Sequence, residues 1–132
     1  MVFLLASLGL AHGFADGSAA FVLASLAEGR SPLEIGLWIL GYNALAFGAQ
    51  ASAGLLVDRA AKPRLAAIAG LLFLALALLV PPAEPTVAIL LAGLGSALFH
   101  PGGGAIAHSL SPGKTTELAV FAAPGVVGLA IG

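Results

Sequence analysis

Long apolar stretches alternate with short polar segments along the whole chain. A helix that spans a bilayer needs about 20 mostly apolar residues. By this measure the pattern predicts five membrane helices, over residues 2–27, 35–57, 65–80, 87–110 and 117–132. The last segment offers only about 15 apolar residues before the chain stops, which is short for a crossing. The sequence therefore predicts an all-α, polytopic membrane bundle that begins and ends inside helices.

The composition supports a membrane class. Hydrophobic residues make up 60% of the 132 residues and charged residues 8%, whereas proteins on average carry roughly 25% charged residues. This balance excludes a soluble globular domain, and it excludes a disordered chain, which needs low hydrophobicity and high charge. The net charge of −1 offers no basic surface for nucleic acid.

The charged residues fall between the apolar segments and predict an orientation. Alternate loops carry four basic residues against one, Arg30; the four are Arg59, Lys62, Arg64 and Lys114. Basic loops remain on the cytoplasmic side of a membrane. We therefore expect a multi-pass protein of the inner (plasma) membrane whose N-terminus is cytoplasmic.

Two ionisable residues lie deep in the first apolar segment. His12 and Asp16 are four residues apart, which places them on one face of a helix. Ionisable groups inside a membrane are costly and usually mark a pathway for ions or substrate. The pair therefore predicts a proton or substrate site, and a buried pair that only fixes helix packing is the alternative. Tyr42 and Asn43, near the start of the second segment, either line a cavity or bond to a neighbouring helix.

The fourth segment carries His100 directly before Pro101 and three glycines, Gly102, Gly103 and Gly104. Proline removes a backbone donor and clashes with the preceding turn, so we expect a kink near residue 97. A broken helix of this kind exposes backbone to substrate in many transporters. His100 either lines such a cavity or bonds to a neighbour at a purely structural kink.

Small residues recur at intervals of four on several segments. Gly9, Gly13 and Gly17 form a doubled Gly-xxx-Gly ridge, which lets a neighbouring backbone approach closely. We expect this ridge to serve helix packing. The same spacing recurs on the second and fifth segments, at Ala44, Gly48 and Ser52 and at Gly128 and Gly132.

No enzymatic or cofactor chemistry is predicted. His12, Asp16, His100 and His108 are metal-ligand types, but no two have the short spacing of a typical metal site, so we expect no metal. The chain has no cysteine, and no phosphate-binding loop occurs. Ser96 stands four residues before His100 without a recognisable nucleophile motif, so we expect neither a hydrolase nor any other enzyme.

The loop after the second segment resembles a family signature. It reads Gly54-Leu-Leu-Val-Asp58-Arg59-Ala-Ala-Lys62-Pro-Arg64. This is similar to the Gly-x-x-x-Asp-Arg-x-Gly-Arg-Arg/Lys loop of the major facilitator superfamily, with Ala61 in place of the usual glycine. The segment Gly93-Leu-Gly-Ser-Ala-Leu-Phe-His-Pro-Gly resembles the fourth helix of fosmidomycin-resistance-type efflux proteins, and His12 and Asp16 resemble that branch too. The last segment resembles the glycine-rich fifth helix of these transporters.

The resemblance implies a secondary transporter of small molecules, built from two six-helix halves around a central site. This chain would be an incomplete N-terminal half, and proton-coupled efflux by antiport is the activity implied. In the family, the signature loop latches the halves together; the matching residues are Gly54, Asp58, Arg59, Lys62 and Arg64. The expected partners are a small-molecule substrate, protons, the lipid bilayer and either the missing half or further copies of the chain.

Two other functions remain open on the sequence. The short last segment favours a small non-transporting membrane protein, either a remnant or a partner that packs against the helices of a larger complex. A chain that assembles its pathway by forming an oligomer is the third possibility, because the glycine ridge would also serve contacts between copies.

Overall fold

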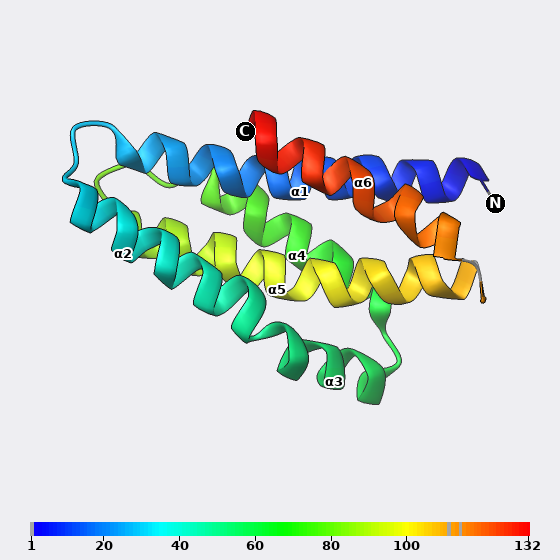
Figure 1. Cartoon of the computed structure of the whole chain (residues 1–132). Helices are drawn as coiled ribbons and strands as arrows, with labels where there is room; N and C mark the ends of the chain where they lie inside the picture. The colour runs from blue at the N-terminus through cyan, green and yellow to red at the C-terminus, as the bar shows by residue number, and fades with distance from the viewer. Residues whose placement is uncertain (1, 111, 114) are drawn as a thin grey trace.

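The computed structural model describes residues 2–110, 112–113 and 115–132, and within them every regular element is helical (Figure 1). The predicted all-α fold class is confirmed. Met1, Ser111 and Lys114 lie outside the described residues. The part of the predicted charge asymmetry that depends on Lys114 therefore lies outside them too.

The helices follow one another with short connections. Their bounds are α1 Val2–Ala27, α2 Pro32–Asn43, the π-helical turn η1 Ala44–Gly48, α3 Gln50–Ala60, α4 Pro63–Ala77, α5 Pro85–Leu110 and α6 Thr115–Ile131. The second segment, expected as one helix over residues 35–57, is therefore divided by η1. The pattern of apolar residues does not predict this turn, because π-helical turns occur inside otherwise regular helices.

The α5 helix is the centre of the bundle. It packs against all the other helices and against η1, and its buried positions are mostly alanine and glycine, with Phe99 fully enclosed. Gly93 gives η1 room to approach, since a Cβ there would lie 2.6 Å from the Cβ of Leu45. Pro101 lies inside α5, which continues to Leu110 without interruption. The helix is therefore not interrupted at this proline, and the expected kink near residue 97 stays a prediction.

Glycine also sets the contact between α4 and α5. A Cβ on Gly70 would lie 2.6 Å from the carbonyl oxygen of Gly95 and from the amide nitrogen of Phe99. Further along the pair, a Cβ on Gly102 would meet the backbone of Ala67 at 2.7 Å. The two backbones touch directly, and larger side chains at these positions would force the helices apart.

The glycine ridge of α1 faces α6. A Cβ on Gly9 would meet Val120, one on Gly13 would meet Pro124, and one on Gly17 would meet Gly128. Because both numbers rise by four together, the two helices run in the same direction, side by side as Figure 1 shows. The small residues of the second segment behave differently: Ala44, Gly48 and Ser52 are exposed, so their expected packing role stays a prediction.

The start of α2 is fixed by a capping box. The side chain of Ser31 accepts a hydrogen bond from the backbone N–H of Glu34, and the Ser31 backbone N–H donates to the Glu34 carboxylate at 3.0 Å. This second bond lowers the pKa of Glu34 below its usual value. Pro32 occupies the first turn, where its missing N–H costs nothing. The Ser-x-x-Glu spacing is a recognised sign of a helix start.

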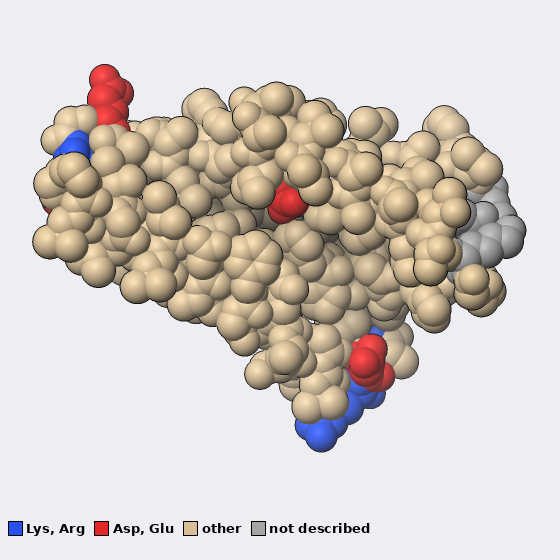
Figure 2. Space-filling view, in the orientation of Figure 1, with Lys and Arg blue, Asp and Glu red and all other residues tan. Residues whose placement is uncertain are grey.

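Among the described residues, two helices are long and apolar enough to cross a membrane, α1 and α5. The apolar helices Pro63–Ala77 and Leu118–Ile131 are shorter; at 1.5 Å per residue, α4 is about 22 Å long, against a hydrocarbon core of about 30 Å. Figure 2 shows the basic side chains and most acidic ones at the extremities of the molecule, with a broad uncharged surface between them. One acidic group is visible near the middle of that face.

Ala61 terminates α3 in the left-handed region, with φ at 50°. L-residues with a Cβ pay roughly 1–2 kcal/mol for this conformation, and glycine does not. The position is the one at which the resemblance expects glycine.

We expect Ala61→Gly to stabilise the chain by about 1 kcal/mol, because it removes the left-handed strain. The matched control is Ala60→Gly, one residue earlier in helical conformation, which should destabilise by up to about 1 kcal/mol. Thermal unfolding followed by circular dichroism in detergent micelles measures both. A lower midpoint for Ala61→Gly than for the unmodified chain would contradict this account of the turn.

Candidate functional site

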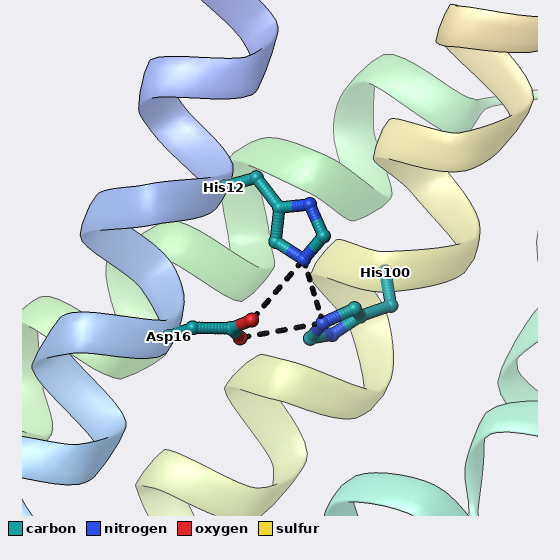
Figure 3. A group of neighbouring side chains, drawn as sticks. All are labelled: His12, Asp16 and His100. Carbon is teal, nitrogen blue, oxygen red and sulfur yellow. Dashed lines mark hydrogen bonds and ion pairs between the residues drawn. The ribbon is translucent and has the colours of Figure 1, made fainter. Parts of the chain in front are cut away.

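Three ionisable side chains from two helices meet in the interior of the bundle. His12 and Asp16 extend from α1, and His100 extends toward them from α5 (Figure 3). The Nε2 atoms of the two histidines are 3.1 Å apart. Asp16 presents Oδ2 to His12 Nε2 at 3.2 Å and Oδ1 to His100 Nε2 at 3.3 Å. We call these three residues the His–Asp–His cluster.

The outer nitrogen of each imidazole is held by a backbone carbonyl. His12 Nδ1 lies 3.0 Å from the carbonyl oxygen of Phe121 on α6. His100 Nδ1 lies 2.8 Å from the carbonyl oxygen of Ser96, one turn earlier on α5, with the Ser96 hydroxyl at 3.1 Å. A carbonyl only accepts hydrogen bonds, so each Nδ1 must carry the proton and donate it. These partners assign the tautomers.

The tautomers leave the centre of the cluster without a hydrogen. With Nδ1 protonated, each neutral imidazole presents a bare lone pair at Nε2, and the Asp16 carboxylate also only accepts. Three acceptors within 3.1–3.3 Å of one another repel unless a positive charge lies between them. Chemically, the arrangement can hold a cation, of which a proton is the smallest.

An apolar shell surrounds His12. Its ring is stacked on Phe121, with ring centres 4.5 Å apart, and tilted against Phe99 at 5.7 Å. His12 is 7% exposed, and the side chains of Asp16 and His100 are 16% and 20% exposed. The low polarity of these surroundings strengthens every electrostatic interaction within the cluster.

A cavity of about 440 Å³ opens onto the cluster from one side. Asp16 and His100 contribute its charged part, and Tyr42 and Asn43 on α2 contribute further polar groups. The rest of the lining is apolar and comes mainly from α1 and α2: Ala20, Leu23, Ala24, Ala27, Ile35, Ile39, Phe47 and Leu129. The Asn43 amide donates to the carbonyl oxygen of Ile39 at 2.7 Å, within its own helix.

The α6 backbone closes the opposite side of the cluster. A Cβ on Gly125 would lie 2.5 Å from His12 Nε2 and 2.8 Å from Asp16 Oδ2. Glycine is therefore required at this position if the cluster is to keep its geometry. Two glycines of α5 differ in the space around them. A Cβ on Gly103 would meet the ring of Phe121, whereas a Cβ on Gly104 would meet nothing within 4 Å.

The residues of the signature-like loop lie at the end of α3 and the start of α4, apart from the cluster. Gly54 sits within α3 beside Pro101. The four charged residues are exposed, and none of them forms an ion pair within the described part of the chain; they are Asp58, Arg59, Lys62 and Arg64. The structure thus brings together His12, Asp16 and His100 and leaves the loop separate.

Two further groups orient the cluster. Ser96 was considered from the sequence only as a nucleophile, although its place one turn before His100 is a spacing that signals contact on a helix. The carbonyl of Phe121 has no signal in the sequence, because a backbone group acts through its position alone.

Searches against protein-family models, curated proteins and solved structures find no match to this chain. The resemblance to the major facilitator superfamily therefore stays a prediction.

We expect Gly125→Ala to destabilise the chain by about 1–3 kcal/mol, because the added methyl group overlaps the His12 ring and the Asp16 carboxylate. Gly104→Ala is the matched control: it adds the same group where nothing lies within 4 Å, and it should stabilise by up to about 1 kcal/mol through helix propensity. Denaturant unfolding in micelles compares the two. Equal stability of both variants would show that α6 does not press against the cluster.

Proposed function

We propose that this chain is part of a secondary active transporter of small molecules, coupled to protons and working in efflux. The observation that carries the proposal is the His–Asp–His cluster, which stands at a cavity between helices that are otherwise apolar. The major-facilitator-like loop and fourth-helix segment support the same class. By that resemblance, a second set of helices completes the pathway.

A five-span arrangement in the inner membrane is part of this proposal. It is supported by α1 and α5, by their length and composition, and by large apolar side chains that are exposed on several helices, such as Phe14, Leu40 and Leu56. Exposed apolar surface on this scale is costly in water and favourable in lipid. The α2, η1 and α3 elements continue one another and together would supply a further span. With the basic Arg59, Lys62 and Arg64 in the cytoplasm, the N-terminus would lie there too.

The cluster supports a transport role because ionisable groups in a membrane interior are expensive. Such groups are rare, face cavities or partners, and mark ion and substrate pathways. The cavity beside it, about 440 Å³, is in the range of sites for small molecules, roughly 300–1,000 Å³. Its lining is mostly apolar with a few polar groups, which suits an amphipathic substrate.

Proton coupling follows from the chemistry of the cluster. One proton between the two Nε2 atoms and the Asp16 carboxylate replaces repulsion among three acceptors with charge-assisted hydrogen bonds. The direction of transport, efflux, is proposed from the resemblance alone. The exposed loop charges are free to contact a second half, as the latch of the family requires.

We expect Asp16→Asn to abolish proton-coupled transport while leaving membrane insertion intact. The amide keeps the shape of the side chain but removes the negative charge that holds the cation. In everted vesicles containing the complete transporter, a panel of amphipathic compounds is added after a pH gradient has formed. A transported compound dissipates the gradient, which a pH-sensitive dye reports.

The matched control is Glu84→Gln, which neutralises an exposed acid in the loop before α5 and should preserve the response. Immunoblots of the membrane fraction verify that both variants insert equally. Full gradient dissipation by Asp16→Asn would contradict the assigned role of the cluster.

A further inference from the structure

The three side chains of the cluster can each offer one ligand atom so that all three atoms lie within 4.8 Å of one another. The two Nε2 atoms are 3.1 Å apart, and the Asp16 oxygens divide between them: Oδ2 lies 3.2 Å from His12 Nε2, and Oδ1 lies 3.3 Å from His100 Nε2. A tetrahedral zinc ion with bonds of about 2.0–2.1 Å holds its ligand atoms about 3.3–3.4 Å apart. The three side chains point toward one another (Figure 3), and a turn of the Asp16 carboxylate that brings one oxygen toward both nitrogens would complete the ligand set.

The surroundings of the two histidines match those of metal-binding histidines. A metal-ligating imidazole almost always donates its other ring N–H to a carbonyl or carboxylate, which fixes the tautomer and raises the basicity of the ligand nitrogen. His12 Nδ1 has the carbonyl of Phe121, and His100 Nδ1 has the carbonyl of Ser96. Both lone pairs at Nε2 are thereby aimed at one point.

We propose that His12 Nε2, His100 Nε2 and one Asp16 carboxylate oxygen bind a single divalent first-row transition metal ion of the zinc type. Two imidazoles and one carboxylate favour such an ion over Mg²⁺ and Ca²⁺, which prefer oxygen ligands throughout. One carboxylate against two positive charges leaves a net charge of +1. The fourth position opens to the cavity that Asp16 and His100 line, where water or an anionic group completes the coordination.

The sequence does not reveal this site because its ligands are far apart along the chain. His12 and Asp16 are one helical turn apart, but His100 comes 88 residues after His12. Only the packing of α1 against α5 joins them. The inference concerns equilibrium binding and holds whether or not the chain transports anything, so it stands apart from the proposed function.

The test is metal binding by the purified chain in detergent micelles. After dialysis against Zn²⁺, elemental analysis should give one zinc per chain. Co²⁺ in place of Zn²⁺ should give the intense visible absorption of a tetrahedral site. The variants His12→Gln, Asp16→Asn and His100→Gln each remove one ligand, and each should weaken binding at least about 100-fold, beyond the 10–100-fold typical of changes to groups that only hydrogen-bond to a ligand.

The matched control is His108→Gln. His108 is exposed on α5, two turns beyond His100, so this variant loses a histidine without touching the cluster and should bind zinc as the unmodified chain does. Circular dichroism and gel filtration show whether each variant keeps its helices. The unmodified chain decides the matter even if the variants fail to fold: no retained zinc, or cobalt with only the weak spectrum of an octahedral ion, would overturn the proposal. An equal loss of zinc in His108→Gln would overturn it as well, because binding would then be nonspecific.

Discussion

The structure depends on the direct contact between the backbones of α1 and α6. The glycines at intervals of four on α1 have no side chains to keep the helices apart, and Gly128 lies opposite them on α6. Small residues of this kind are how helices pack closely where water cannot drive them together. Because α6 lies so near, the Phe121 carbonyl reaches the ring of His12. The orientation of the ring follows from the packing of the two backbones.

The same close packing organises α5. Gly70 and Gly95 bring α4 and α5 together, and Phe99 fills the remaining volume at the centre. His100 follows Phe99 directly, so the rigid position of the buried ring also sets the position of the imidazole. The bundle thus relies on small residues to place a few polar groups accurately, and backbone and aromatic rings border the cluster on the side away from the cavity.

The sequence predicted the helical class and the pairing of His12 with Asp16, because both follow from local rules of spacing. It also drew attention to His100, but on account of Pro101, and the helix proved continuous there. It could not predict that His100 meets the pair, since which faces of two distant helices touch is decided by tertiary packing. The π-helical turn η1 was missed for a related reason: its apolar residues fit a regular helix equally well. The Phe121 carbonyl could not be found in a pattern of side chains at all.

Access to the cluster is one-sided. Among the described residues, the cavity approaches it between α1 and α2, while Gly125 and the α6 backbone seal the other face. A carrier, as proposed for this chain, must open its site to two compartments in turn. We propose the contact between α1 and α6 as the place where the second opening would form. The α1 side of this contact is a row of glycines without interlocking side chains. Such a surface lets one helix slide along another, or separate from it, with little rearrangement of side chains.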